Sequence, residues 1–319
     1  MRARLIANPK SGMDRVSDAL PLITGRLRTI VDDLDVTITA SGEDAERAAA
    51  GALDQPGDAL YVAGGDGTLN AVLRGLASRD GLRALPIGVI PFGTGNDFVK
   101  ALDLGDEPEA ALEALLAARL VDVDIGLLND RPFANTSAGG FIADVSEQVT
   151  ETLKDVTGKL AYLIGGARAL LGTVPFSARL TVNDAASGAC CEVAGALDMQ
   201  MFVAANARFI GGGYEIAPAA LIDDGLLDVL VVPRMPILQF VGVLQGLAAP
   251  GNVAPPGVLH FRTSSFDLEF DRPVNVNADG ELLEARACRY RVIPAGARFF
   301  CGPHPHATQQ PRSVAATDG

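Results

Sequence analysis

The sequence contains no tryptophan, and aromatic side chains make up only 5% of its 319 residues. Basic residues are also scarce, because 26 Lys and Arg stand against 39 Asp and Glu, for a formal net charge of −13. Binding to a nucleic-acid backbone depends on clustered cations, so this balance excludes nucleic acid as an expected partner. An anionic membrane would repel the chain as a whole. A local basic face could still dock on it, with Lys154, Lys159 and Arg168 as candidates, although these residues also fit a solvated helix face.

Cysteine and histidine are too few and too scattered to build a site. Cys190 and Cys191 are adjacent, while Cys288 and Cys301 lie far away, so the spacing of a zinc site or a disulfide scaffold is absent. This favours a reducing cytoplasm as the location. The three histidines include His260 on an alternating strand and suggest no Ser-His-Asp arrangement. The longest apolar helix candidate, 235–249, is shorter than the ~20 residues that a bilayer requires.

What the chain does contain is glycine (35 residues) and 48% hydrophobic residues, which suit two domains of an α/β protein with tight turns. Strand and helix patterns alternate through the first third, which predicts a parallel sheet covered on both faces, with ligands at the carboxyl ends of its strands. We expect strands at 4–7, 36–39, 59–63 and 87–90, and helices at 14–31, 43–53, directly after 64–68, and from 96.

The pattern changes after about residue 124. Two helix-like stretches at 144–153 and 159–171 precede β-rich sequence, which predicts a mostly antiparallel second domain with strands at 176–182, 192–205, 226–232, 258–270 and 289–293. We therefore expect an α/β domain over 1–124, a β-rich domain over 125–302 and a disordered tail over 303–319, where little side-chain surface can be buried.

A glycine-rich loop, Gly64-Gly65-Asp66-Gly67-Thr68, follows the apolar run 59–63 and precedes a helix pattern. Glycines let backbone N–H groups turn toward an anion, and the helix N-terminus adds its positive end. A carboxylate in such a loop would repel bare phosphate, so Asp66 fits best beside a divalent cation or an accepted proton. A sharp turn without any ligand is the alternative.

A second loop, Gly93-Thr94-Gly95-Asn96-Asp97, again follows a strand and opens a helix. Two such loops at neighbouring strand ends predict one phosphate-binding crevice. The pair matches neither standard nucleotide motif: G-x-x-x-x-G-K-[ST] is missing, and Asn70 stands where the dinucleotide fingerprint has its third glycine. Lys10 could neutralise phosphate or be a solvated loop lysine.

Two acidic segments follow in the second domain. Carboxylate and carbonyl oxygens in 221–228 are ligands that a hard divalent ion prefers, although Asp-Asp-Gly is also a common hairpin turn. In 277–281, Asp279-Gly280 favours a tight hairpin that presents Glu281 at its rim. Glu281 could accept the proton of an attacking hydroxyl, or it could be a surface residue.

Read in order, these segments resemble the bacterial diacylglycerol kinase catalytic family, including the YegS-like lipid kinases. The resemblance runs from residue 5 to about residue 300 and rests on Asn8-Pro9-x-Ser11-Gly12, Gly64 to Asn70, Pro91-x-Gly93-Thr94-x-Asn96-Asp97-Phe98, Asn206-Ala207-x-x-x-Gly211-Gly212-Gly213, Ile216-Ala217-Pro218, Asp224 to Val229 and Asp279-Gly280-Glu281. It implies a Rossmann-like nucleotide-binding domain of the NAD kinase and diacylglycerol kinase type, a C-terminal β-sandwich-like domain, and an active site between them.

The resemblance also implies a role for each matching residue. ATP would contact Thr39, Gly64, Gly65, Asp66, Gly67, Thr68, Leu69, Asn70 and Thr94. Asp66 would belong to the catalytic phosphate and magnesium apparatus, and Glu281 would accept the proton. A structural Mg²⁺ would bind the Asp224 side chain and the Leu221 and Leu226 carbonyls, and Asp97 and Asp124 could join the acidic metal network. The chain departs from the family at Gly42-Glu43-Asp44-Ala45, a difference that bears on the register of Thr39, and at Lys100, where Arg is frequent.

We therefore expect an ATP-dependent lipid kinase whose acceptor is a lipid alcohol, with diacylglycerol first among the candidates. The apolar stretches 160–171 and 235–249 could line an acyl-chain site or simply pack in the core. We also expect a cytoplasmic protein with a transient contact at the inner face of the membrane, and a homodimer is compatible with the sequence. Two alternatives stay open: a NAD-kinase-like phosphotransferase, whose Thr-Pro-Thr-Gly-Ser-Thr segment is missing here, and a non-catalytic nucleotide-binding regulator.

Overall fold

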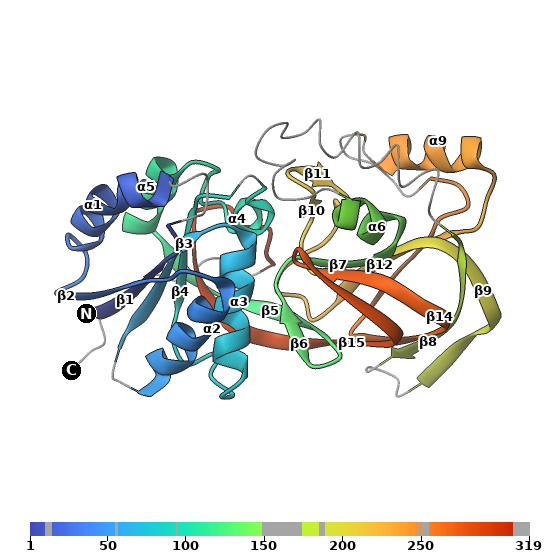
Figure 1. Cartoon of the computed structure of the whole chain (residues 1–319), viewed down its shortest axis with the longest axis horizontal. Helices are drawn as coiled ribbons and strands as arrows, with labels where there is room; N and C mark the ends of the chain where they lie inside the picture. The colour runs from blue at the N-terminus through green and yellow to red at the C-terminus, as the bar shows by residue number, and fades with distance from the viewer. Residues whose placement is uncertain are drawn as a thin grey trace. The chain divides into compact units, whose positions relative to one another are not determined.

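The computed structural model describes residues 1–9, 15–54, 57–93, 95–148, 174–184, 189–247, 249 and 255–308. The chain forms two compact units, of which the first comprises Met1–Ile125, Ile222–Asp224 and Pro294–Gly319, and the second Gly126–Leu221 and Gly225–Ile293. The strands of the first unit pair mainly in parallel and those of the second in antiparallel orientation, so each unit is described separately (Figure 1).

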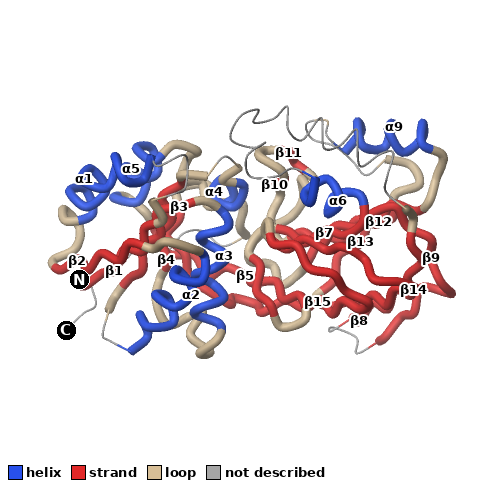
Figure 2. Tube along the Cα trace, in the orientation of Figure 1, coloured by secondary structure: helices blue, strands red, loops and turns tan. Residues whose placement is uncertain are grey.

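The first unit is built on a parallel sheet in the order β2-β1-β3-β4. Helices α1 and α5 lie on one side of this sheet, and α2 and α3 on the other (Figures 1 and 2). The predicted alternation of strands and helices is confirmed, with one helix more than expected. Its elements are β1 (Arg2–Ala7), α1 (Arg15–Leu27), β2 (Asp33–Ile38), α2 (Gly42–Gly51), the 3-10 helix η1 (Ala52–Asp54), β3 (Ala59–Gly64), α3 (Asp66–Ala77), β4 (Ile87–Pro91), α4 (Asp97–Ala101) and the additional α5 (Pro108–Leu116).

Local chemistry explains the boundaries and packing of α2 and α3. Ser41 caps α2 by accepting a hydrogen bond from the Asp44 N–H at 3.2 Å, a contribution of about 1 kcal/mol. Gly75 lies where α3 crosses α2, and a Cβ there would collide with the Glu46 carbonyl oxygen. The absence of a side chain at Gly75 therefore sets how closely the two helices approach.

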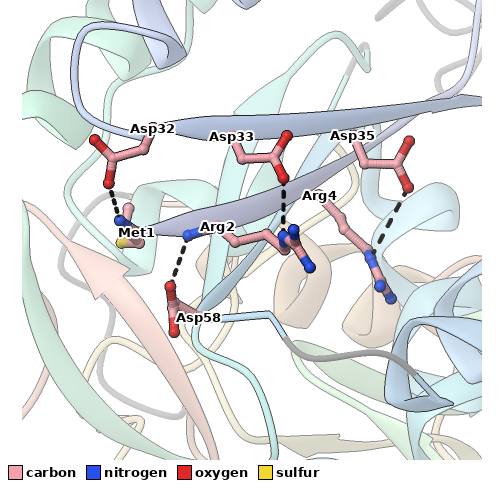
Figure 3. Close-up of polar contacts among 7 residues, drawn as sticks. All are labelled: Met1, Arg2, Arg4, Asp32, Asp33, Asp35 and Asp58. Carbon is pink, nitrogen blue, oxygen red and sulfur yellow. Dashed lines mark hydrogen bonds and ion pairs between the residues drawn. The ribbon is translucent and has the colours of Figure 1, made fainter.

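The outer strand β2 is joined to β1 by cross-strand ion pairs (Figure 3). The register places Arg2 opposite Asp33 and Arg4 opposite Asp35, and the Arg2 Nε lies 2.8 Å from the Asp33 Oδ2. Both partners are about half exposed, so this pair contributes less than about 1 kcal/mol to stability. Because a slipped register would separate the charges, the pairs chiefly specify the alignment of this edge strand.

The strands of the second unit pair in antiparallel orientation, as expected, and they are more numerous than the sequence predicts. The predicted strand at 258–270 is divided at Ser264 into β13 and β14. Its elements are β6 (Arg131–Phe133), β7 (Thr136–Gly140), α6 (Phe141–Gln148), β8 (Phe176–Asp184), β9 (Ala189–Ala205), β10 (Phe209–Ile210), β11 (Tyr214–Glu215), β12 (Leu227–Pro233), α9 (Ile237–Leu247), β13 (Leu259–Thr263) and β14 (Ser265–Ala278).

Alternating side chains of β12 supply two separate cores, because successive residues of a strand point to opposite faces. Leu227 and Val229 join a cluster that contains the stacked rings of Phe266 and Tyr290, whose centroids are 4.5 Å apart. Leu230 and Val232 join a second cluster with residues of α6 and α9. The unit is thus a β structure with one internal core and one core beneath helices.

Two strands and one turn carry the chain from one unit to the other. Strand β5 (Arg119–Leu128) leaves the first unit, the short segment Ile222–Asp224 rejoins it, and the end of β15 (Glu281–Cys301) returns to it. In that return Phe299 pairs with Ile87 of β4 in parallel. The division therefore differs from the expected consecutive domains 1–124 and 125–302. The reason is that strand pairing far along the chain leaves no local sequence signal.

The residues expected to begin a disordered tail also differ from that expectation. Residues 303–308 are described and hydrogen-bonded in the first unit, where the His306 N–H donates to the Ala101 carbonyl at 2.9 Å. Residues 309–319 lie outside the described residues, as do Lys10, Lys154, Lys159, Arg168 and the predicted helix at 159–171.

Candidate functional site

The first unit brings the two predicted phosphate-binding loops to one edge of its sheet. In the order β2-β1-β3-β4, β2 is added on one side of β1 and β3 on the other, so the strand order reverses beside β1. Ligands of such parallel sheets bind at the carboxyl ends of the strands beside that switch point. The Asn8 N–H donates to the Ala63 carbonyl at 3.0 Å, which ties the ends of β1 and β3 together. The ends of these two strands are therefore neighbours, as the sequence predicts.

The loop after β3 turns sharply into α3. Gly65 is the N-cap residue, Asp66 opens the helix, and the Thr68 N–H donates back to the Gly65 carbonyl at 2.9 Å. A Cβ on Gly64 would lie 2.6 Å from the Thr68 side chain, so glycine is required there. The Asn8 side chain donates to the Thr68 hydroxyl at 3.2 Å. Thr68 is thus fixed by its neighbours at the N-terminus of a twelve-residue helix.

The two glycine loops meet backbone to backbone. A Cβ on Gly65 would lie 2.9 Å from the Cα of Gly93, and a Cβ on Gly93 would lie 2.8 Å from the Cα of Gly65. Real Cβ atoms do not approach backbone that closely, so both positions need glycine. The Phe92 N–H also donates to the Gly64 carbonyl at 2.9 Å. The predicted proximity of the loops is confirmed for their described residues, whereas Thr94 lies outside them.

Asp66 links the two loops through its carboxylate, whose Oδ2 accepts a hydrogen bond from the Asp97 N–H at 3.3 Å. Asp97 opens α4, and its own carboxylate lies 3.4 Å from the Lys100 ammonium, which also donates to the Gly95 carbonyl at 2.8 Å. The Asp97 side chain is only 7% exposed. Two carboxylates and one ammonium are therefore held together where the loops meet.

These loops fit a phosphate-bearing ligand. Gly67 is exposed, and a Cβ there would meet nothing within 4 Å, so the first turn of α3 borders open space. Asn96 adopts a left-handed conformation (φ 48°), and in the part of the chain that is described its buried Oδ1 has no hydrogen-bond partner. A helix N-terminus beside glycine backbone and an amide group is an environment that favours anions.

Other predicted nucleotide residues are buried in this unit. Thr39 is 2% exposed, and its hydroxyl donates to the Ala7 carbonyl at 3.2 Å at the end of β1. Asn70 is 2% exposed, and its Oδ1 accepts from the Arg74 guanidinium at 2.5 Å, while Arg74 also pairs with Glu46. Leu69 is likewise buried. Their side chains thus support the loop rather than line open space.

The predicted metal ligands lie in a single turn, Leu221–Leu226, in which Gly225 has a positive φ of 75°. Within the described ranges, no three His, Cys, Asp or Glu side chains form a metal-binding group. The expected set contains one carboxylate, from Asp224, and two backbone carbonyls, from Leu221 and Leu226, so it does not depend on such a cluster. An all-oxygen donor set fits Mg²⁺.

In the second unit, Glu281 begins β15 at the rim of a tight hairpin. Asp279 and Gly280 both have positive φ angles, 47° and 93°, and Ala278 pairs with Glu281. The predicted Asp-Gly hairpin is therefore confirmed. Its position is fixed by the Asp279 carboxylate, which accepts hydrogen bonds from the N–H groups of Ala134, Asn135 and Thr136 at 2.6, 3.0 and 2.9 Å.

Two structural carboxylates have roles that the sequence did not reveal. The sequence indicates Asp279 only as a turn residue. Asp124, a candidate for the metal network, is 1% exposed, and its Oδ1 accepts from the Ala295 N–H at 2.7 Å. Its backbone N–H donates to the Ile222 carbonyl at 2.7 Å. Their partners lie at least 98 residues away, so no motif could indicate these bonds.

Comparison with known proteins places the chain in a family. The model of the diacylglycerol kinase catalytic domain matches residues 2–128, and that of the YegS C-terminal NAD kinase beta sandwich-like domain matches residues 136–301. The chain is 36% identical over 307 residues to the "Probable lipid kinase YegS-like" of Stenotrophomonas maltophilia, covering 93% of this chain and 95% of that protein. The chain belongs to the diacylglycerol kinase catalytic domain family.

Further members of the diacylglycerol kinase family are similar along most of the chain. The "Diacylglycerol kinase" of Staphylococcus saprophyticus is 31% identical over 281 residues, covering 88% of both chains. A crystal structure of a diacylglycerol kinase from Bacillus anthracis superposes with a TM-score of 0.77 at 24% identity, covering 95% of this chain and 97% of that one, which bears on the fold. The Rossmann-like and β-sandwich-like architecture is confirmed, and the family is a family of phosphotransferases.

Proposed function

We propose that the protein transfers the γ-phosphate of ATP to the hydroxyl of a lipid alcohol, with diacylglycerol as the acceptor and phosphatidic acid as the product. The acceptor oxygen forms a bond to the γ-phosphorus, the bond from that phosphorus to the bridging oxygen breaks, and ADP leaves. The hydroxyl proton passes to a carboxylate. The names of the relatives, lipid kinase and diacylglycerol kinase, support this reaction class.

The observation that carries the proposal is the junction of the two glycine loops. Gly65 and Gly93 approach so closely that neither tolerates a Cβ, and Asp66 and Asp97 are joined at the same point. Backbone N–H groups and a helix N-terminus stabilise the charge that develops on phosphoryl oxygens. We assign the nucleotide contacts to Thr39, Gly64, Gly65, Asp66, Gly67, Thr68, Leu69, Asn70 and Thr94.

Thr39, Leu69 and Asn70 enter this assignment through their backbone and through the loops that they support. The Thr39 N–H and hydroxyl both bond the Ala7 carbonyl, so Thr39 anchors the end of β2 beside β1. Asn70 holds Arg74 against Glu46, which fixes α3 beneath the loop. We therefore expect substitutions at these three residues to weaken ATP binding by displacing the loop.

Mg²⁺ supplies charge neutralisation for phosphate oxygens and a fixed point for the turn that binds it. We propose that the Asp66 carboxylate faces the metal that accompanies ATP, and that Leu221, Asp224 and Leu226 hold a second, structural ion. The positive φ of Gly225 turns the backbone between Asp224 and Leu226, which supports a turn able to direct carbonyl oxygens to one ion.

We assign the role of proton acceptor to Glu281. Its hairpin is anchored by three N–H groups on the Asp279 carboxylate, so the residue at the rim has a defined position. A catalytic base must reach the acceptor hydroxyl within hydrogen-bond distance, and a rigid support makes that geometry reproducible.

Helix α9 supports a contact with the lipid surface. None of its eleven residues is charged, Phe240, Val243 and Leu247 pack into the core, and Leu238 is 85% exposed. No helix in the described part of the chain is long and apolar enough to cross a membrane. We propose that the protein works at the cytoplasmic face of the membrane and that the Leu238 side of α9 contacts lipid. Residues 160–171, the other candidate for an acyl-chain site, lie outside the described residues.

The deciding experiment supplies labelled ATP with diacylglycerol, sphingosine-type bases, phosphatidylglycerol and NAD in separate reactions. Label in the lipid phase supports the proposal, label on NAD supports the NAD-kinase alternative, and no transfer supports a nucleotide-binding regulator. Asp66→Asn and Glu281→Gln should each lower turnover by at least about 100-fold. Two exposed carboxylates serve as matched controls, Asp18→Asn on α1 and Glu284→Gln on β15, and both should retain turnover. Full turnover of either site variant would contradict the assignment.

A further inference from the structure

Residues 302–308 run along the C-terminal end of α4. The Gly302 N–H donates to the Leu102 carbonyl at 2.9 Å, the His304 N–H to the Asp103 carboxylate at 2.8 Å, and the His306 N–H to the Ala101 carbonyl at 2.9 Å. A Cβ on Gly302 would collide with the Asp103 carbonyl oxygen, so the approach is close. Alternate residues of this segment are therefore hydrogen-bonded to the end of α4 and the two residues after it.

The same segment also holds the turn Leu221–Leu226. The His306 carbonyl accepts a hydrogen bond from the Ile222 N–H at 2.9 Å. Thr308 donates twice to the Asp223 carboxylate, from its N–H at 2.6 Å and from its hydroxyl at 2.8 Å. Ile222 is fully buried, and its carbonyl accepts from the Asp124 N–H. Both backbone groups of Ile222 are thus engaged, directly between the residues assigned to the metal.

We infer that residues 302–308 are a positioning strap that couples the metal turn to the nucleotide loops. His306 bonds the last residue of α4 through its N–H and the turn through its carbonyl. The first residue of α4 is Asp97, whose N–H bonds Asp66. The short helix therefore connects the strap to the point where the two glycine loops meet. The inference rests on the proposed function, because that proposal assigns Mg²⁺ to the turn.

The strap has an expected thermodynamic signature. A ligand that binds only the folded protein raises its stability by an amount that grows with the logarithm of the ligand concentration divided by Kd. If the strap presents the turn in its binding geometry, its loss weakens Mg²⁺ binding, and the displaced α4 then weakens ATP binding. A merely structural contribution would lower stability equally with and without Mg²⁺. A comparison of stability with and without Mg²⁺ thus distinguishes coupling between the metal and the strap from a general stabilising effect of the strap.

The test compares the full chain, a chain ending at Thr308 and a chain ending at Gly302. The unfolding temperature is measured in EDTA and in Mg²⁺, and the dissociation constant of a non-hydrolysable ATP analogue is measured without lipid. We expect the chain ending at Thr308 to behave as the full chain. The chain ending at Gly302 should lose most of the Mg²⁺-induced rise in unfolding temperature and bind the analogue about tenfold more weakly.

A milder pair of variants covers the case in which the chain ending at Gly302 does not fold. Thr308→Val removes the hydroxyl that donates to Asp223, whereas Thr308→Ser retains it. The Mg²⁺ concentration at half-maximal stabilisation should rise about two- to tenfold in Thr308→Val and stay unchanged in Thr308→Ser.

Three results would overturn the strap. The first is a full Mg²⁺-induced rise in unfolding temperature in a folded chain that ends at Gly302, and the second is an unchanged Mg²⁺ concentration at half-maximal stabilisation in Thr308→Val. The third is a full-length chain whose unfolding temperature does not rise with Mg²⁺. None of these measurements uses a lipid acceptor. Failure of the lipid kinase assay and failure of the strap are therefore distinguishable.

Discussion

The backbone N–H of Asp97 donates a hydrogen bond to the Oδ2 of Asp66 at 3.3 Å, and this bond joins the two loops that follow β3 and β4. Each residue opens a helix, α3 or α4, so each carboxylate lies at the positive end of a helix dipole. The dipoles offset the repulsion between two neighbouring acidic groups. Under the proposed function, this arrangement would hold a metal and a nucleotide phosphate.

Lys100 stabilises the Asp97 end of this arrangement, and its substitution is the first prediction. Its ammonium contacts the Asp97 carboxylate and the Gly95 carbonyl. Lys100→Met should lower kcat/KM for ATP by about tenfold, because a nearly buried carboxylate loses its charged partner. Lys100→Arg, which keeps the charge, should recover most of the activity. Equal kinetics for Met and wild type would show that Lys100 does not support the loops.

Substitutions at two glycines of the first loop distinguish an effect on folding stability from an effect on ligand binding. In Gly65→Ala the new Cβ would lie 2.9 Å from the Cα of Gly93, so the loops must separate, and both the free energy of unfolding and ATP affinity should fall. In Gly67→Ala the Cβ meets no protein atom within 4 Å. Alanine there should raise stability by about 0.5–1 kcal/mol, because it replaces glycine in a helix.

ATP affinity decides how the Gly67 result is interpreted. If phosphate approaches the first turn of α3, Gly67→Ala binds ATP more weakly although it is more stable. Chemical denaturation and calorimetric titration of the same two preparations provide both quantities. A Gly67→Ala protein with unchanged affinity would place the phosphate elsewhere.

The two glycine loops of the site could be predicted from sequence because the residue patterns that indicate them are local. The run 59–63, the glycines that follow it and the helix pattern after them indicate a strand, a loop and a helix in order, and parallel strands bring successive loops to one edge. The meeting of Gly65 and Gly93 is a direct consequence. The loop alone indicates Asp66 as a site residue, whereas its hydrogen bond to Asp97 depends on the second loop. Its role beside a cation stays a prediction.

The remaining features depend on contacts between residues far apart in sequence. Asp279 binds N–H groups more than 140 residues away, and Asp124 binds Ala295, which has a left-handed φ of 50°. Neither contact leaves a pattern around either partner. The same reason explains why the sequence predicts a disordered tail at His306. Its polar neighbours contain little to bury, whereas its N–H donates to the distant Ala101 carbonyl and its carbonyl accepts from the distant Ile222 N–H.

Asp279 is predicted to be a major determinant of stability in the second unit. Asp279→Ala leaves the N–H groups of Ala134, Asn135 and Thr136 without their acceptor and should cost about 2–4 kcal/mol of unfolding free energy. Asp279→Asn retains one acceptor oxygen, so its loss of unfolding free energy should be smaller than that of Asp279→Ala. The control is Glu269→Ala, which removes a surface ion pair with Arg179 and should change stability by less than about 0.5 kcal/mol. Similar losses at both positions would contradict a stabilising role for the three hydrogen bonds on Asp279.

The buried phenol of Tyr61 is predicted to make the free energy of unfolding depend on pH in the alkaline range. Its side chain is 1% exposed on β3 and stacks on Phe300 with ring centroids 5.8 Å apart. Burial raises the pKa of Tyr61 from 10.0 to about 12. The folded protein therefore keeps a neutral phenol between pH 10 and 12, while the unfolded chain ionises. Because the unfolded state binds fewer protons in this range, the free energy of unfolding falls as pH rises, by up to about 1.4 kcal/mol per pH unit from this group.

Tyr61→Phe retains the ring stacking and removes the ionisable hydroxyl, so it isolates this contribution. The difference in unfolding free energy between wild type and Tyr61→Phe should be constant below pH 10 and should then shift in favour of the variant up to pH 12. Urea unfolding followed by circular dichroism at several pH values measures it. Tyr214→Phe, at a ring 45% exposed on β11, controls for the loss of a tyrosine hydroxyl at an exposed position. A difference between wild type and Tyr61→Phe that stays flat up to pH 12 would mean that the phenol is solvated in the folded state.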